Sequence, residues 1–481
     1  MKAAIASAIR AALAAADPVA AFRARVSTAT AHMFTLDGGA RVFDFSSATS
    51  ALVVGAGKAS VALAAEVVRA LGRLDPPLRV DGGLIVTRDG HAAESDANEL
   101  ARAGVGLRFA SHPVPDGRGV AAASELLSLV RARARGVAVI VCLSGGASAL
   151  LPAPAAGLSL DDLSSLGSLL LASGAPIADV NAVRKHCSEI AGGRLGAAAA
   201  DAGAIGVLTL AVSDVVGDAL DVIGSGPTVR DESTFADAAR VLRECAPNGA
   251  GVPAAVAAHI AAGVAGEREE TDKVTSRRGH DFWLLSTNNS ATSAAAAAFS
   301  AHGWSARVVA NDLVGDAARV AATRLAAALT ATPPHSVLIY GGETTVVLGV
   351  SRAPGGRNQE LALATAVESA RISDGSAGGG GSGCAPASWD TLRWAVACIA
   401  TDGTDGTTDA AGAIVTSETA SAAARRGLDM RVALQSHEAH ALLKCLGGDG
   451  RDALLPGAEG GLLVTGPTGT NVMDLAFVVK M

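Results

Sequence analysis

Three aspartates stand close together in the segment 401–409, which has the sequence TDGTDGTTD. The carboxylates of Asp402, Asp405 and Asp409 repel one another, and a shared cation would offset that repulsion. An apolar run typical of a buried strand precedes them. The segment begins like an EF-hand loop, but Ala413 stands where that loop needs a glutamate. We predict that Asp402 and Asp405 bind a metal ion; the alternative is a solvated acidic turn.

A glycine-rich turn with one lysine, GAGKAS, follows another apolar run. Gly55 and Gly57 let the backbone close on a phosphate, the next helix offers N–H donors, and Lys58 adds a positive charge. The turn is not a Walker A loop, because the earlier glycine of that motif is missing. We interpret it as a phosphate site; the alternative is a tight strand–helix turn with an exposed lysine.

A second glycine turn has the sequence SGGAS. The backbone at Gly145 and Gly146, with the hydroxyls of Ser144 and Ser148, could cradle another anion. The nucleophile motif of α/β-hydrolases is broken by Leu150. A closely packed turn without a ligand is the alternative.

Two predicted helices carry cations in positions that suit anions. Asn181 begins the segment NAVRKH, from which Arg184 and Lys185 could reach a carboxylate or phosphate. A solvated helix face would have the same composition. Arg357 precedes an apolar helix in GGRNQE, where the helix dipole disfavours a cation unless an anion binds there.

One further aspartate, Asp214, follows an apolar run in the motif SDVVGD. A carboxylate at the end of a strand, next to a glycine turn, suits Mg²⁺ binding or general-base catalysis. Capping of a helix is the alternative.

The elements that must position these residues alternate along the chain. Apolar, β-branched runs begin at Ala51, Val137, Gly206, Ser336 and Trp394, and each leads into a glycine-containing turn. Runs without polar alternation predict parallel strands covered by helices on both faces. In such sheets ligands bind beside the carboxyl ends of the strands, where the motifs above fall.

The length of 481 residues predicts more than one domain. Polar segments place a boundary near 240–280, and the glycine-rich segment 372–388 is expected to be a disordered insertion. Apolar residues near the N-terminus recur at helical spacing, which predicts a first surface helix rather than a targeting peptide.

Composition limits the function classes. The net charge of −7 argues against nucleic-acid binding. The long uncharged stretches contain Asn, Ser, Thr or Pro, so we expect a soluble protein with no membrane partner. The six cysteines show no CxxC spacing, which favours reduced thiols and a cytoplasmic protein.

The motifs together resemble the glycerate 2-kinases whose C-terminal half is called the MOFRL domain. The resemblance extends from the first helix to Leu475 and rests on the following segments: VVGAGKAS, SHPVPDGRG, LSGGASALLPAP, NAVRKHCSEIAGGRLG, SDVVGD, GSGPT, GGETTVVLG, GGRNQELALA, ATDGTDGTTDAAGA and VTGPTGTNVMDL. It implies two α/β domains, each a mostly parallel sheet flanked by helices, with the active site in the cleft between them. The domains would be a Rossmann-like glycerate kinase domain at 1–245 and a MOFRL-type domain at 280–481.

The resemblance also implies ligands and roles. ATP, Mg²⁺ and D-glycerate would bind, in a monomer or homodimer. Lys58 and Arg357 fall where the family has its key catalytic cations and would stabilise the transferring phosphoryl group. Gly341 and Gly342, with Glu343, would cradle phosphates or line the cleft. An aspartate, Asp214 among the candidates, would hold Mg²⁺ or take the proton from the 2-hydroxyl.

The main alternative is an NAD(P)H-dependent hydroxypyruvate reductase. The GAGKAS turn has Ser60 in place of the third glycine of a dinucleotide fingerprint. The region about twenty residues further on lacks a strand-end acid in the setting that a ribose needs. Both observations favour the kinase.

Overall fold

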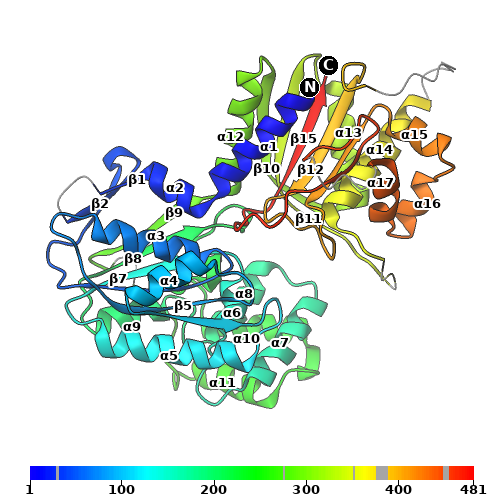
Figure 1. The fold of residues 1–481 in the computed structure, drawn as a ribbon. Helices are drawn as coiled ribbons and strands as arrows, with labels where there is room; N and C mark the ends of the chain where they lie inside the picture. The colour runs from blue at the N-terminus through cyan, green and yellow to red at the C-terminus, as the bar shows by residue number, and fades with distance from the viewer. Residues whose placement is uncertain (29–31, 275–276, 350, 352, 375–387, 448–453) are drawn as a thin grey trace. The chain divides into compact units, whose positions relative to one another are not determined.

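The computed structural model describes residues 1–28, 32–274, 277–349, 351, 353–374, 388–447 and 454–481. It divides into two compact units (Figure 1). Unit 1 consists of Met1–Asp17 and Ser286–Met481, and unit 2 of Pro18–Leu285. The division at 285/286 lies beyond the expected boundary region 240–280, so 246–285 belong to unit 2, and the N-terminal segment belongs to unit 1 with the C-terminal part. Residues 375–387 of the predicted insertion lie outside the described residues.

Unit 2 is built on a six-stranded sheet of order β6-β5-β4-β7-β8-β9 and a small antiparallel sheet β1-β2-β3. Its strands are β1 (Val26–Ser27), β2 (Met33–Leu36), β3 (Arg41–Asp44), β4 (Ala51–Ala56), β5 (Val80–Arg88), β6 (Val105–Ala110), β7 (Ala138–Leu143), β8 (Gly206–Val212) and β9 (His280–Ser286). Its helices and short helical turns are α2 (Pro18–Arg25), η1 (Asp37–Gly39), α3 (Ser60–Gly72), α4 (Glu94–Arg102), α5 (Gly117–Arg133), α6 (Ala147–Leu150), α7 (Leu160–Ala172), α8 (Ile177–His186), α9 (Arg194–Asp201), η2 (Ile223–Ser225), α10 (Phe235–Cys245), η3 (Pro247–Gly249) and α11 (Ala254–Val264).

The strands of unit 2 lack polar alternation because both faces of the sheet are covered. Val53 of β4 packs with residues of α3 on one face, while Leu52 and Val54 pack with residues of α5 on the other. All three side chains are fully buried, and each buried aliphatic side chain contributes roughly 1.5–3 kcal/mol of transfer free energy. The pairs β4–β5, β4–β7, β5–β6 and β7–β8 are parallel, which confirms the predicted α/β class.

Unit 1 contains a second six-stranded sheet, of order β10-β11-β15-β12-β13-β14. Its strands are β10 (Ser305–Asp316), β11 (Ser336–Thr345), β12 (Trp394–Ala400), β13 (Gly412–Thr416), β14 (Gly461–Leu463) and β15 (Asp474–Lys480). Its helices are α1 (Lys2–Ala16), α12 (Asn288–Ala301), the π-helical turn η4 (Ala317–Ala321), α13 (Ala322–Ala331), α14 (Arg357–Asp374), α15 (Thr419–Arg425), α16 (Met430–Gln435) and α17 (Ala439–Gly447).

The sheet of unit 1 is mixed rather than mostly parallel. Only β10 and β11 pair in parallel among its described strands, and β15 runs antiparallel to β11 and β12. Helices cover both faces of this sheet as well (Figure 1). Antiparallel strands buried on both faces have the same unbroken apolar pattern as parallel strands, so that part of the sequence prediction was wrong here.

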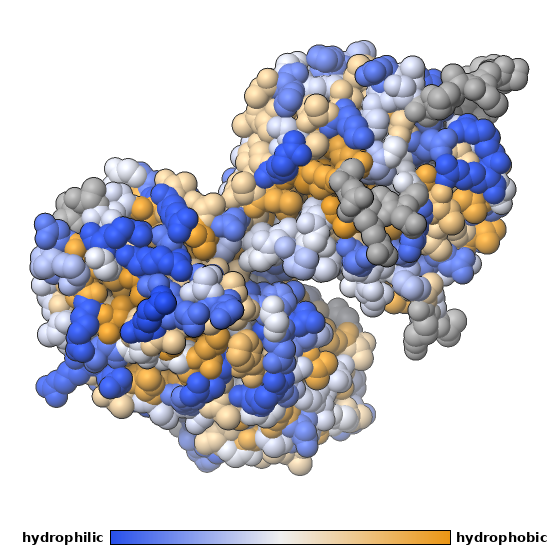
Figure 2. Space-filling view, viewed as in Figure 1, coloured by the Kyte–Doolittle hydropathy of each residue, from blue (hydrophilic) through white to orange (hydrophobic). Residues whose placement is uncertain are grey.

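Helix α1 belongs to the fold, as predicted. Ile5, Ala8, Ile9 and Ala12 are fully buried on one side of it, and the helix packs along α12 (Figure 1). Among the described residues, no single helix is long and apolar enough to cross a membrane, and only α1 and α2 taken together pass that test of length and composition. Hydrophilic and apolar residues lie side by side on the face shown in Figure 2.

Candidate functional site

The sheet of unit 2 reverses its strand order between β4 and β7, so a crevice is expected at their carboxyl ends. The two predicted glycine turns meet there. The Lys58 N–H donates to the Gly145 carbonyl at 3.0 Å, and the Ala59 N–H donates to Ser144 Oγ at 2.9 Å. The structure thus brings GAGKAS and SGGAS together.

The glycines of these turns allow a backbone approach that a side chain would prevent. A Cβ atom on Gly55 would lie 2.0 Å from the Cys142 carbonyl oxygen, and one on Gly57 would lie 2.1 Å from Ser144 Oγ. Gly57 also has a φ of +138°, which disfavours other residues. The pattern GxG therefore reflects the contact between the two turns.

His112, for which the sequence pattern predicted no role, lies beside these turns. A Cβ atom on Gly146 would lie 2.8 Å from Cδ2 of His112, so the imidazole ring packs against the glycine. Burial, together with the smaller effects of the nearby Lys58, Arg88 and His91, lowers the pKa of His112 to about 4. At neutral pH His112 is therefore uncharged in a basic surrounding, which suits an anion. The motif SHPVPDGRG was the only signal for it in the sequence.

A pocket of about 400 Å³ in unit 2 extends from the second turn. Ser148 and Arg184 line it, and Ser148 Oγ lies 2.9 Å from Ser225 Oγ. Asn181 is buried and does not belong to the lining. Asp214 follows β8 as expected and is half-buried.

Lys185 is engaged inside the unit. It is 2% exposed, and its Nζ lies 2.8 Å from Asp221 Oδ2 and 3.2 Å from Asp231 Oδ1. Since two carboxylates already balance its charge, the structure gives Lys185 a stabilising role and does not place it on the pocket.

In unit 1, Arg357 is the first residue of α14 and is held by two acidic side chains. Its Nε and Nη2 donate to the carboxylate of Asp474 at 2.5 and 3.0 Å, and Nη1 lies 3.0 Å from Glu343 Oε1. Burial raises the pKa of Asp474 to about 7, against the opposing effect of Arg357. The guanidinium, about one third exposed, is fixed in its orientation at the start of a helix. Asp474 was missed in the sequence because it lies 117 residues further along the chain.

Asp405 caps α14 and is not placed to bind a metal. Its carboxylate accepts from the backbone N–H groups of Asn358 at 3.0 Å and Gln359 at 2.9 Å, and also from both side-chain amides. A Cβ atom on Gly356 would lie 2.2 Å from Asp405 Cγ, so the glycine makes this approach possible. Four N–H donors occupy the oxygens that a metal would need, which argues against the metal role predicted for Asp405.

Asp402 differs from Asp405 in its surroundings. It is half-buried, and it accepts from the Thr404 N–H at 3.0 Å and from the Thr404 hydroxyl at 3.2 Å. No group of three or more His, Cys, Asp or Glu side chains within the described ranges is arranged to hold a metal. Mg²⁺ in nucleotide sites takes one or two carboxylates together with phosphates and waters. The donor chemistry of Asp402 fits such an ion.

Gly341 and Gly342 lie within β11 rather than in a turn, so the expected phosphate cradle is absent from these described residues. A Cβ atom on Gly341 would lie 1.6 Å from Asn288 Oδ1, and one on Gly342 would lie 2.5 Å from the Leu313 backbone. Both glycines instead border a small cavity of about 10 Å³.

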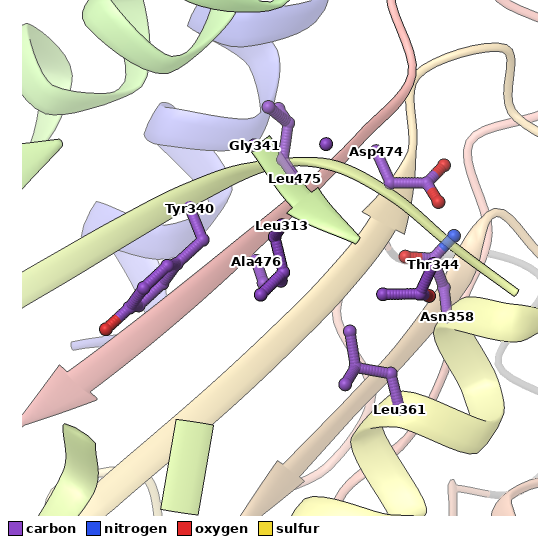
Figure 3. Close-up of a pocket in the computed structure, with 10 residues that line it drawn as sticks. Leu313, Tyr340, Gly341, Thr344, Asn358, Leu361, Asp474, Leu475 and Ala476 are labelled. Atoms are coloured by element: carbon purple, nitrogen blue, oxygen red, sulfur yellow. The ribbon is translucent and has the colours of Figure 1, made fainter. Parts of the chain in front are cut away.

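This cavity has a polar end, where Asp474, Thr344 and Asn358 gather (Figure 3). The buried atoms Thr344 Oγ1 and Asn358 Oδ1 have no hydrogen-bond partner among the described residues. The volume suits one water molecule and excludes a phosphate group. We therefore interpret this cavity as part of the surroundings of Asp474 and not as a substrate site.

The fold and these sites together define a two-unit α/β protein with basic groups at strand and helix ends suited to anionic small molecules. A domain of unknown function, DUF4147, matches residues 4–261, and the MOFRL family matches residues 336–474.

Curated relatives are similar over most of the chain. A glycerate 2-kinase of Pyrococcus horikoshii is 35% identical over 89% of this chain and 86% of its own. A protein of Agrobacterium vitis, provisionally named a hydroxypyruvate reductase, is 36% identical over 89% of this chain and 86% of its own. The crystal structure of a glycerate kinase from Thermotoga maritima matches with a TM-score of 0.76 and 29% identity, covering 100% of this chain and 99% of that one. The chain belongs to the glycerate kinase family.

Proposed function

We propose that the protein transfers the γ-phosphoryl group of ATP to the 2-hydroxyl of D-glycerate. The observation that carries the proposal is the meeting of the two glycine turns at the strand-order reversal of unit 2, with Lys58 on one of them. Membership of the glycerate kinase family supports the choice of substrate.

Phosphoryl transfer requires positioning and the neutralisation of spread negative charge more than covalent catalysis. Lys58 stands at a turn whose neighbours, Arg88 and His91, are also basic. Arg357 is fixed by Asp474 and Glu343. We assign both Lys58 and Arg357 to the stabilisation of the phosphoryl oxygens.

The reaction also needs an acceptor for one proton. The glycerate 2-oxygen forms a bond to the γ-phosphorus, the bond from that phosphorus to the β–γ bridging oxygen breaks, and ADP leaves. The hydroxyl proton would pass to a carboxylate, for which we propose Asp214 at the end of β8. Asp402 would hold Mg²⁺, which when bound offsets phosphate charge.

The test uses purified protein with ATP, Mg²⁺ and D-glycerate, coupled to enolase without a mutase. Phosphoenolpyruvate forms only if the 2-hydroxyl is phosphorylated, so its formation supports the proposal. Release of ADP without phosphoenolpyruvate would indicate the 3-position. If no ADP is released, oxidation of NADH by hydroxypyruvate becomes the next assay, since it tests the reductase alternative.

Replacement of either cation should abolish turnover. We expect Lys58→Ala and Arg357→Ala each to lower kcat at least about 10³-fold, since each removes a charge that stabilises the transition state. Circular dichroism and thermal unfolding would check that the fold is kept. A variant with near wild-type turnover would remove that residue from the mechanism.

The cysteines accord with the cytoplasmic location that we propose. All five described cysteines are free thiols, and Cys142, Cys187 and Cys398 are buried. Free thiols are typical of a reducing compartment.

A further inference from the structure

The 400 Å³ pocket of unit 2 has a lining that D-glycerate does not explain. Most of its walls are apolar, with residues from the loop 113–115, from α6 and α7, and from the segments that follow α6 and α8; among them are Pro113, Leu151, Leu163, Leu166 and Ile190. Its volume lies in the range, roughly 300–1,000 Å³, of sites for ligands much larger than a three-carbon acid. A small polar acid would leave most of this apolar surface in contact with water.

One charged group, Arg184, lines the pocket. Its guanidinium makes no hydrogen bond or ion pair in the described part of the chain, and burial lowers the pKa of Arg184. The neighbouring cations differ: Lys185 is paired with two aspartates, and Arg194 donates to two carbonyl oxygens. A half-buried guanidinium without a partner is costly unless a ligand supplies negative charge.

The pocket is continuous with the turns assigned to phosphates. Pro113 in its wall follows His112, which packs on Gly146 and lies close enough to Lys58 for the lysine to lower its pKa. Ala147 and Ser148, directly after the second turn, also line the pocket. The pocket therefore begins at the strand-order reversal, where open α/β sheets bind nucleotides.

We propose that this pocket binds the purine nucleoside of ATP, with Arg184 paired to a phosphate oxygen. The planar faces of a purine suit the leucine- and proline-rich walls, and the polyphosphate would extend toward the glycine turns and Lys58. The proposal deepens the proposed function and rests on it for the identity of the nucleotide.

The first test measures binding of ADP by calorimetry, which needs no turnover. Gly167 on α7 lines the pocket, and a Cβ atom placed on it would have Arg184 Nη2, at 3.8 Å, as its nearest neighbour beyond the helix. We expect Gly167→Phe to fill the pocket and to weaken ADP binding at least about 10-fold. The matched control is Gly72→Phe, at an exposed site on α3 with nothing within 4 Å, which should bind ADP like the wild type.

The second test separates the contribution of the Arg184 charge to binding from that of the pocket's shape. Arg184→Gln should weaken ADP about 10-fold or more and adenosine much less, because only ADP carries phosphates. In the coupled assay both variants should raise KM for ATP and leave KM for D-glycerate within about twofold of the wild type.

Three results would overturn the inference: no ADP binding by the wild type, wild-type ADP binding by Gly167→Phe, or a raised KM for D-glycerate alone. ADP binding that Gly167→Phe abolishes, in a protein that does not phosphorylate glycerate, would uphold the pocket and overturn the proposed function. The two ideas can thus fail separately.

Discussion

Asp474 and Arg357 form the ion pair on which the proposed role of unit 1 in the reaction depends. The carboxylate holds the guanidinium through two hydrogen bonds, so Asp474 acts as a positioning residue for Arg357. We expect Asp474→Asn to lower kcat about 10- to 100-fold, since an amide replaces a charge-assisted pair. Initial rates at saturating substrates would measure the loss.

The same residue predicts a pH dependence. Burial raises the pKa of Asp474 to about 7, so the carboxylate gains a proton as the pH falls below that value and the pair weakens. The wild-type kcat should therefore fall between pH 8 and 6, and Asp474→Asn should remove this inflection. Glu343→Gln, which removes the other partner of Arg357, is the control that should keep it. By linkage, the contribution of Asp474 to stability is full below its unfolded pKa of about 4 and is lost as the pH rises through about 7.

The sequence predicted those site residues whose neighbours lie within the same short segment of the chain. Gly55, Gly57 and Lys58 are read from one turn, and that turn lies where expected. The sequence did not separate Asp402 from Asp405, since the difference depends on a helix that begins some fifty residues earlier. It missed His112 and Asp474 for the same reason: their partners are distant in the chain.

Among the elements, α14 depends on a carboxylate outside itself. Asp405 satisfies N–H groups that the first turn of a helix leaves without partners. We expect Asp405→Ala to destabilise unit 1 by about 2–4 kcal/mol, because it removes the cap and leaves buried donors unpaired. Chemical denaturation followed by circular dichroism would measure this.

The control for that prediction is Asp402→Asn. It should change stability by less than about 1 kcal/mol, since the side chain is half-buried and its bonds to Thr404 lie within one exposed turn. If Asp402 holds Mg²⁺, this variant should instead need more Mg²⁺ for half-maximal rate. A stable Asp405→Ala protein with an altered Mg²⁺ requirement would reverse the two assignments.

The two sheets show that an unbroken apolar run predicts a buried strand but not the direction of its neighbours. In unit 2 the unbroken apolar runs of β4, β7 and β8 correspond to parallel strands. In unit 1 the same pattern belongs to antiparallel neighbours, because β15, the last strand, inserts between β11 and β12. Burial on both faces determines the pattern, whereas strand direction depends on where the chain returns.

In the whole molecule, one structural unit combines segments from the two ends of the chain. Unit 2 is continuous in sequence, whereas unit 1 needs α1 from the start of the chain together with everything from Ser286 onward. The buried face of α1 and the bond from the Thr470 hydroxyl to the Ala16 carbonyl tie this first helix to the C-terminal part. A substitution that disrupts the packing of α1 should therefore destabilise unit 1.

We expect Ile9→Asp to destabilise unit 1 selectively. Ile9 is fully buried, and an unpaired buried carboxylate costs about 3–5 kcal/mol, whereas the adjacent Arg10 is exposed and Arg10→Asp should cost less than about 1 kcal/mol. Hydrogen exchange read by mass spectrometry should show lost protection in α12, β11 and β15, with β4 and β7 of unit 2 protected as in the wild type. Equal loss in both units would mean that they unfold together, and the ADP-binding pocket would then depend on a helix with which it shares no unit.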